Sequence, residues 1–408
     1  MRFLKNFLLF FILSLFLFLL VIYSFPQVKG KKESDRMVVG GDMGFFKKNY
    51  TKFNGNAFVE KGSARMLADE IEYFELTNLA IGRGNVVLTE SKNGLIIKGG
   101  YSEYYGDKNL IVFFESPNLT LSNRNIFLKG DVLFLDQSNE IVVSSNNSFL
   151  TNEKLVAYAD VIEIINRSNI IRFLGNSKVI SSNFTIYANN GFVFMVTNKY
   201  TKEINIDKYV GIGNVKIFDN SGFLLCDRIV INFESNEVKD YVSYGNVKIS
   251  NSNTYITSDY FRSVFDKGKD ILHIGMTNVS VINLDNGDRM YGDNLFSDKV
   301  KGFEFLYGNA VFESQGRNVR VYSHVIERHV DKKIIYMKKD VRVRTEGIDI
   351  VSDIGKYDES TGYMYLLGNA RILSGDKLGL SVNSIVVDSK KDKVTFYGSD
   401  YGYVIPGM

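Results

Sequence analysis

The chain has 408 residues, and its 45% hydrophobic content is enough for an extensive core, which excludes an intrinsically disordered protein. Its 49 basic and 46 acidic residues are interspersed and leave a formal net charge of +3, so nothing in the charge predicts binding of nucleic acid. The single cysteine, Cys226, excludes a disulfide framework, and 24 Tyr, 31 Phe and 35 Gly against 3 Pro favour an all-β fold.

The N-terminus predicts a membrane anchor. Phe7–Phe25 is an uncharged apolar run just long enough, at about 1.5 Å per residue, to cross a hydrocarbon layer of about 30 Å. Arg2 and Lys5 precede it, so the N-terminal end is expected in the cytoplasm. The alternative is a cleaved signal peptide, which usually has a shorter apolar region that ends in small residues. Ile22 and Tyr23 stand at that end, so a retained anchor is favoured.

Over about Ala68–Ser399 the chain repeats one short sequence phrase. A Gly-Asn pair or a stand-in recurs about every 31 residues, with one longer interval between Asn176 and Asn214. A small residue followed by Asp comes later in each phrase, as in Cys226–Asp227 and Ser258–Asp259. The landmark residues of the Gly-Asn series are Asn85, Asn118, Asn147, Asn176, Asn214, Asn246, Asn278, Asn309, Asp340, Asn369 and Ser399.

The segments between the landmarks have the pattern of β-strands. Ile229, Ile231 and Phe233 alternate with Arg228 and Asn232, a period of two that is typical of half-buried strands. Phrases such as "DKGKD" and "DESTG" between such segments favour tight turns. The Gly-Asn pair is expected to mark a bulge or bend within one long strand, and the recurring Asp to accept hydrogen bonds. Each phrase then forms an antiparallel unit that buries its apolar face by stacking on its neighbours.

No catalytic or cofactor-binding constellation is present. His273, His324 and His329 are the only histidines, and none belongs to an HExxH pattern. The chain also has no GxSxG elbow and no phosphate-binding GxxxxGK[ST] loop. The recurring Asp residues occupy equivalent places, whereas calcium-binding solenoids have a much shorter period. We therefore predict a protein without enzyme activity, cofactor or metal.

The anchor followed by tandem "G-N-V-x-I … A/S-D-x-I" units resembles the OstA-like lipopolysaccharide-transport family, with its membrane-anchored LptC and soluble LptA members. Gly211–Ser235 ("GIGNVKIFDNSGFLLCDRIVINFES") and Tyr244–Phe261 ("YGNVKISNSNTYITSDYF") carry the resemblance, which extends over about Ala68–Ser399. It implies an extended antiparallel β-jellyroll: two sheets that form a V-shaped trough. Such proteins join edge to edge into a bridge that carries lipopolysaccharide from an inner-membrane ABC transporter towards the outer membrane.

The resemblance also implies the organisation of the chain and its partners. The repeat region is about twice as long as a single anchored member needs, so two jellyrolls are expected. The implied partners are lipopolysaccharide, the permease subunits of the transporter, and other jellyroll bridge proteins, which would pair with edge strands such as "KVTFYGSDYGYVIPGM". The bulk of the chain would lie in the periplasm, with a single pass through the inner membrane. The expected parts are a cytoplasmic N-terminus (1–6), a transmembrane helix (7–25), a linker (26–52), an LptC-like jellyroll (53–205) and LptA-like jellyroll repeats (206–408).

The lipid-contacting residues are predicted from physical reasoning, because the family's lipid contacts follow no fixed motif. Each CH₂ group that an acyl chain exposes to water costs about 0.8 kcal/mol, and a trough lined by inward strand residues removes this cost. The same positions would also suit plain structural core. The predicted lining consists of Val215, Ile217, Ile229, Ile231, Val247, Ile249, Phe261, Val279, Val281, Phe312, Val343 and Ile372.

Two other classes of protein compete with this interpretation. One is a surface structural protein or adhesin built as a parallel β-helix, and the other is a carbohydrate-active β-solenoid enzyme. The enzyme would need paired carboxylates or metal ligands concentrated in a few units. The direction of strand pairing distinguishes the β-helix, since it requires parallel strands offset by one period.

Overall fold

The computed structural model describes residues 38–61, 63–90, 94–121, 126–151, 155–165, 167–181, 184–197, 204–220, 222–234, 237–345, 348–373, 381–391, 393–398 and 402–405. The predicted transmembrane segment Phe7–Phe25 lies outside these residues. No helix among the described residues is long and apolar enough to cross a membrane. The described chain consists of β-strands with short 3-10 helices and no α-helix, which confirms the predicted all-β class. The 3-10 helices are η3 (Glu75–Thr77), η4 (Gly106–Lys108) and η6 (Gln315–Arg317).

The chain divides into two compact units. The N-terminal unit holds the described residues up to Asn220 together with 230–238, and the C-terminal unit holds 221–229 and the residues from Lys239 onward. Strand β16 (Gly222–Glu234) contributes to both units. The boundary that the sequence predicts between residues 205 and 206 falls inside strand β15, which pairs with β14 within the N-terminal unit.

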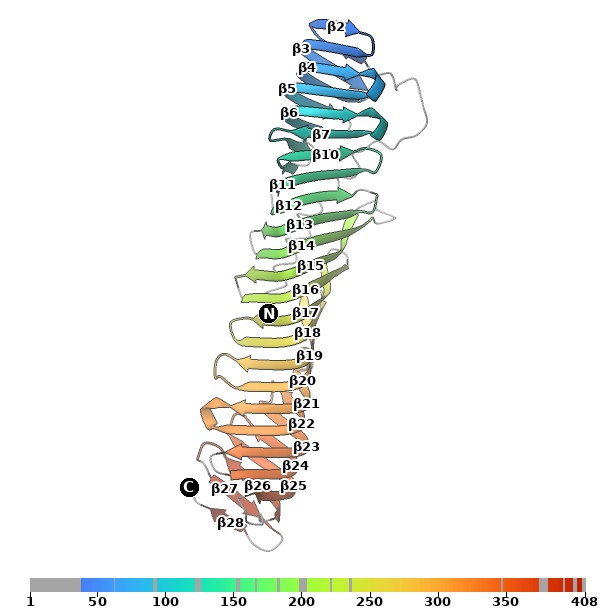
Figure 1. The fold of residues 1–408 in the computed structure, drawn as a ribbon. Helices are drawn as coiled ribbons and strands as arrows, with labels where there is room; N and C mark the ends of the chain where they lie inside the picture. The colour runs from blue at the N-terminus through green and yellow to red at the C-terminus, as the bar shows by residue number, and fades with distance from the viewer. Residues whose placement is uncertain are drawn as a thin grey trace. The chain divides into compact units, whose positions relative to one another are not determined.

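In the N-terminal unit the strands follow one another in chain order (Figure 1), except that β10 pairs with β7 while β8 pairs with β9. Two short strands take the place of one long strand at three points: β1 and β2 both pair with β3, β7 and β8 with β6, and β9 and β10 with β11. The strands are β1 (Val38–Gly40), β2 (Met43–Lys47), β3 (Tyr50–Lys61), β4 (Ala64–Phe74), β5 (Leu79–Glu90), β6 (Leu95–Tyr105), β7 (Leu110–Phe114), β8 (Asn118–Leu121), β9 (Ile126–Lys129), β10 (Val132–Asp136), β11 (Ile141–Thr151), β12 (Leu155–Ile165), β13 (Ile170–Ser181), β14 (Phe184–Thr197) and β15 (Ile204–Asp219).

In the C-terminal unit each strand from β17 to β27 pairs with the next one along the chain. Every described pair in both units is antiparallel, as predicted, and this contradicts the parallel β-helix. The strands are β17 (Glu237–Ser250), β18 (Thr254–Asp266), β19 (Lys269–Asn283), β20 (Arg289–Asp298), β21 (Phe303–Ser314), β22 (Val319–His329), β23 (Ile334–Thr345), β24 (Ile348–Asp358), β25 (Tyr363–Leu373), β26 (Ser381–Asp388), β27 (Lys393–Tyr397) and β28 (Gly402–Ile405).

The Gly-Asn pair interrupts the regular geometry of a long strand at a point that we call the corner. In β17 the pair is Gly245 and Asn246, whose φ angles are 69° and 49°. The cross-strand register shifts at the same place, between Tyr244 and Val247. Gly suits the first position because a residue with a Cβ atom is strained at such a φ angle. The prediction that the Gly-Asn pair marks a bulge within one strand is confirmed.

The small residue and the Asp that follows it in each phrase lie on the neighbouring strand, directly beside the Gly-Asn pair. Asn246 Nδ2 donates a hydrogen bond to Asp227 Oδ2 over 2.9 Å. Asp therefore accepts a hydrogen bond, as predicted, and the donor is the Asn side chain of another strand. Equivalent bonds of 2.8 to 3.1 Å join Asn85 to Asp69, Asn176 to Asp160, Asn278 to Asp259, Asn309 to Asp293 and Asn369 to Asp353.

Some landmarks of the sequence need correction. Asn118 is not a corner residue, because the positive φ angles, 63° and 58°, belong to Glu115–Ser116. A corner that the sequence analysis missed precedes the first predicted one, since Asn56 Nδ2 donates to Asp42 Oδ2 over 2.9 Å. Ser399 lies outside the described residues.

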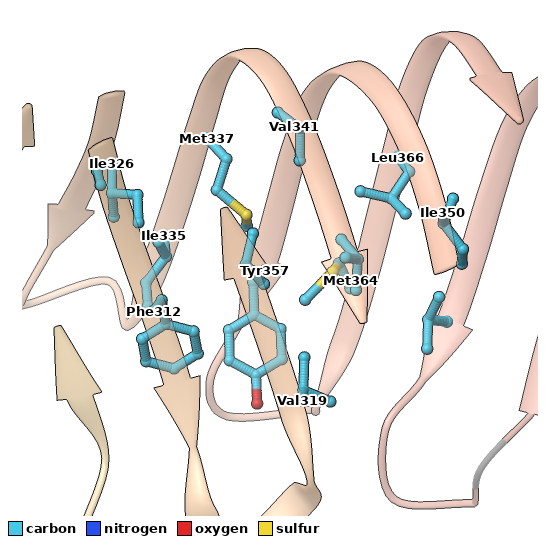
Figure 2. Packing of buried hydrophobic residues seen from close by; sticks show 14 of the residues in the cluster. Phe312, Val319, Ile326, Ile335, Met337, Val341, Ile350, Tyr357, Met364 and Leu366 are labelled. Atoms are coloured by element: carbon cyan, nitrogen blue, oxygen red, sulfur yellow. The ribbon is translucent and has the colours of Figure 1, made fainter. Parts of the chain in front are cut away.

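Alternate side chains of each strand point to one buried face, which forms the core. In the C-terminal unit a single buried cluster extends from β19 to β27. Its members Phe312, Ile326, Ile335, Met337 and Leu366 are at most 2% exposed, and Figure 2 shows such side chains next to one another on successive strands. The half-buried strands predicted from the period of two are thus confirmed.

Candidate lipid-contacting interior

In the C-terminal unit the corner divides the strands into two arms. We call arm A the segments that precede a Gly-Asn pair or follow a small-Asp pair, and arm B the segments on the other side of the corner. Within arm A, Leu306 pairs with Ile326, and within arm B, Phe312 pairs with Val321. The ring of Phe312 on arm B lies 5.8 Å from the ring of Tyr357 on arm A, although β21 and β24 are not neighbouring strands. The inner faces of the two arms therefore contact each other.

The structure places all the predicted lining residues on strands and most of them in the buried core. Val281 and Ile372 are partly buried and pack against the core cluster. Phe261 lies on arm A, opposite to the "V-x-I" positions of arm B. Contact of these side chains with lipid stays a prediction. The residues with exposures of 0 to 7% are Val215, Ile217, Ile229, Ile231, Val247, Ile249, Phe261, Val279, Phe312 and Val343.

The low exposure of these side chains shows that the interior between the arms is packed with protein atoms. Val247, Phe312 and Val343 are 1%, 2% and 0% exposed, so they touch other protein atoms and almost no water. A lipid chain between the arms would therefore take the place of contacts such as the one between Phe312 and Tyr357. In the structure this apolar surface is covered by the opposite arm.

A row of polar side chains interrupts the apolar inner face of arm A. Ser263 and Ser297 are fully buried and His273 is 2% exposed, so these groups belong to the interior. The next residue in register is Ile335, where the inner face becomes apolar again. Cross-strand pairing on β17 to β22 aligns the members of this polar row in the order Tyr241, Ser263, His273, Ser297, Glu304 and Arg328.

At the centre of the polar row a carboxylate joins two neighbouring strands. Asp270 accepts a hydrogen bond of 2.8 Å from Ser263 Oγ, and its other oxygen lies 2.6 Å from His273 Nε2. The imidazole ring also contacts the ring of Phe261, at 5.2 Å between centroids. Burial lowers the pKa of His273 below its ordinary value, although Asp270 acts in the opposite direction. His273 is therefore neutral at neutral pH.

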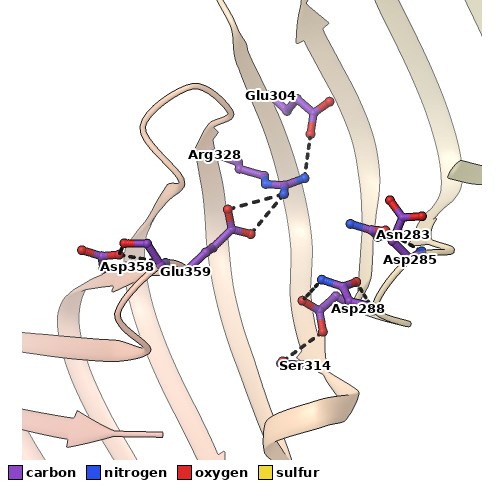
Figure 3. A network of polar contacts seen from close by, with 10 residues as sticks. Asn283, Asp285, Asp288, Glu304, Ser314, Arg328, Asp358 and Glu359 are labelled. Atoms are coloured by element: carbon purple, nitrogen blue, oxygen red, sulfur yellow. Dashed lines mark hydrogen bonds and ion pairs between the residues drawn. The ribbon is translucent and has the colours of Figure 1, made fainter. Parts of the chain in front are cut away.

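The other end of the row is an ion-pair network. Lys299 Nζ lies 3.0 Å from a carboxylate oxygen of Glu304. Arg328 bridges Glu304 and Glu359 at 3.7 and 3.1 Å (Figure 3). Burial alone would raise the pKa of Glu304, but Lys299 and Arg328 outweigh it and hold that pKa below its ordinary value. Sequence reasoning missed this row, because its members are far apart in the chain and only the strand register aligns them.

The cysteine and the surface cations that the sequence offers as further candidate functional groups have structural roles. Cys226 is buried at a corner, and burial raises the pKa of its thiol to about 12, so it is not a nucleophile in this state. Lys338 Nζ pairs with Glu327 at 2.6 Å, and Arg344 pairs with Asp349 at 3.2 Å, so these cations have acidic partners on the surface. Within the described part of the chain, no cluster of three or more His, Cys, Asp or Glu side chains could hold a metal ion.

Comparison with known proteins does not assign the chain to a family. No model of a protein family matches it, and no curated protein matches it. Among solved structures it is similar to LptH from Pseudomonas aeruginosa, described as the LptA homologous periplasmic component of the conserved lipopolysaccharide transport device. The two chains are 13% identical, and the similarity covers 40% of this chain and 92% of that one, with a TM-score of 0.19.

Proposed function

We propose that the chain is a periplasmic component of lipopolysaccharide transport, that Phe7–Phe25 anchors it in the inner membrane, and that it carries acyl chains between the arms of a β-jellyroll without catalysis. The observation that carries the proposal is the inner face of arm B, which is apolar and buried in the same register on strand after strand. The repeated phrases that resemble the OstA-like family support it. The sequence of the anchor supports the location.

The antiparallel ladder offers a physical route for an acyl chain. Neighbouring strands are about 4.8 Å apart, so the inner face of arm B presents similar apolar contacts at short, regular steps across the strands. A chain held there avoids the cost of about 0.8 kcal/mol for each CH₂ group exposed to water. Because successive steps provide similar contacts, an acyl chain can advance from one strand to the next without leaving an apolar environment.

The proposed protein partners would pair with the end strands. At one end of the ladder in the N-terminal unit, β2 exposes Met43, Phe45 and Phe46 by 66%, 49% and 69%. An end strand with exposed apolar side chains is a template for another protein's strand. We propose that the permease subunits of an inner-membrane ABC transporter and other jellyroll bridge proteins add strands at such edges, with β27 and β28 as the C-terminal donor edge.

The enzyme alternative lacks a supporting arrangement. Its paired carboxylates would have to converge in a few repeats, whereas the recurring Asp residues each bind the Asn of a corner, as Asp293 binds Asn309 over 3.1 Å. This distribution of single carboxylates over separate corners supports a structural role for the Asp residues, and at one corner Asn189 takes the place of Asp as the partner of Asn214.

Site-specific crosslinking tests the proposal. A photo-reactive amino acid at the buried Val247 is expected to label lipopolysaccharide in living cells, and the same amino acid at the exposed neighbour Lys248 serves as the control. Depletion of the protein is expected to leave lipopolysaccharide in the inner membrane. Equal labelling at the two positions would contradict the proposed path, and unchanged lipopolysaccharide at the cell surface after depletion would contradict the transport role.

A further inference from the structure

His273 is the one histidine that the structure places in the interior. It is 2% exposed and lies on β19 between Ser263 of β18 and Ser297 of β20, which are both fully buried. Its Nε2 atom is 2.6 Å from Asp270 Oδ2. A neutral imidazole with its proton on Nε2 donates this hydrogen bond, and the site then holds the negative charge of Asp270 without a second charge on the ring.

The charged groups around the His273 ring do not stabilise its protonated form enough to offset burial. Asp270, on the same strand, and Glu304, from β21, favour a protonated ring, whereas Lys299, from the turn after β20, opposes it. Glu304 is itself neutralised by Lys299 and Arg328. From β18 the ring contacts the ring of Phe261 and lies across from Ser263, and Tyr241 of β17 is the next member of the row beyond Ser263. Asp270 is thus the carboxylate that hydrogen-bonds the ring, and it is shared with Ser263.

We propose that the polar row is a pH-sensitive latch that keeps β18, β19 and β20 closed against one another at neutral pH and loosens them when His273 becomes protonated. Protonation adds an N–H group at Nδ1 and a positive charge to a ring that is almost completely buried. The charge becomes solvated when β18, β19 and β20 separate locally from their neighbours and admit water. The inference holds whether or not the interior carries lipid.

The direction of the effect follows from linkage. Burial lowers the pKa of His273 in the closed state, whereas in an opened state it returns to about 6.5. The opened state then binds the proton more tightly, so the closed state loses stability as pH falls below about 6.5. For one proton the opening equilibrium rises by up to about tenfold for each pH unit, until the lower pKa of the closed state is reached.

Hydrogen–deuterium exchange of the full chain between pH 7.5 and pH 5.5 tests the latch, with rates corrected for the pH dependence of intrinsic exchange. Peptides from β19 and β20 are expected to open several-fold more at the lower pH, while peptides from β25, outside the polar row, stay unchanged. The variant His273→Gln keeps a donor for Asp270 but cannot titrate, so its β19 exchange should lose the pH dependence. His329→Gln is the matched control, because His329 is 28% exposed and lies outside the row.

A second measurement keeps the test decisive if His273→Gln does not fold. The chain has only 3 histidines, so selective labelling of histidine rings gives a simple NMR titration of the wild-type protein. One ring is expected to titrate below the ordinary pKa of histidine and in step with the exchange of β19. Corrected exchange of β19 that does not change with pH, or the absence of any ring with a lowered titration midpoint, would overturn the latch.

Discussion

Replacing Gly245 by Ala is expected to destabilise the corner of β17 by about 2–3 kcal/mol, for two reasons. Gly245 has a φ angle of 69°, which costs a residue with a Cβ atom about 1–2 kcal/mol. An added Cβ would also lie 2.2 Å from Asp227 Oδ2, so the Asp227 side chain would have to move. That movement breaks its 2.9 Å hydrogen bond with Asn246, which contributes about 1 kcal/mol.

Native-state hydrogen exchange of amides in β17 and β18 measures this loss. A local measurement is preferable because stacked repeats need not unfold in one step. Gly316→Ala is the control: its Cβ would meet nothing within 4 Å and its φ angle is not left-handed, so a change below about 0.5 kcal/mol is expected. Removing the clash with Asp227→Ala should restore part of the stability lost in Gly245→Ala. Equal effects of Gly245→Ala and Gly316→Ala would refute the reasoning about the corner.

Three further predictions follow from the same geometry. Thr277→Gly should stabilise its corner by about 1 kcal/mol in the same exchange assay, because Thr277 holds a β-branched side chain at a φ angle of 60°. Phe312→Ala should lower the local stability of β21 and β22 in the same exchange assay by about 3–5 kcal/mol, and a loss below about 1 kcal/mol would contradict contact between the arms. Hydrogen bonding to Arg342 holds the pKa of Asp349 below its ordinary value, so its contribution is present above about pH 3.9 and is lost as pH falls through the lower pKa. Asp349→Asn should accordingly lose less stability than the wild-type protein when thermal unfolding is compared between pH 5 and pH 2.

The corners could be found in the sequence because their chemistry restricts the residue types. Gly245 has the φ angle that favours glycine, and Cys226 and Asp227 stand where a small buried side chain and an acceptor for Asn246 are needed. The Gly-Asn pattern does not identify a corner where other residues adopt the same backbone conformation. Glu115–Ser116 has the two positive φ angles without Gly or Asn, so the pattern was assigned to the wrong residues nearby.

The polar row could not be predicted, because its members are brought together only by the register of the strands. Ser263 and His273 are cross-strand partners around one turn, but the next partner, Ser297, belongs to a different turn. A shift of the register by one residue would send these side chains to the opposite face of the sheet. The sequence indicates inward and outward positions within one strand, whereas the alignment of several strands depends on the length of every turn and on every corner.

The contact between the two arms bears directly on how an acyl chain could enter. Opening the arms exposes apolar side chains such as Phe312 and Tyr357, and an acyl chain that takes their place buries them again. Each exchange replaces protein–protein contact with protein–lipid contact of similar apolar area, while the lipid's own CH₂ groups leave water at about 0.8 kcal/mol each. In the proposed function, the gain from the lipid would therefore offset the cost of separating the arms. Such binding would be reversible, as the proposed carrier role requires, since a permanently open apolar trough would hold the acyl chain more tightly and expose its lining to water when empty.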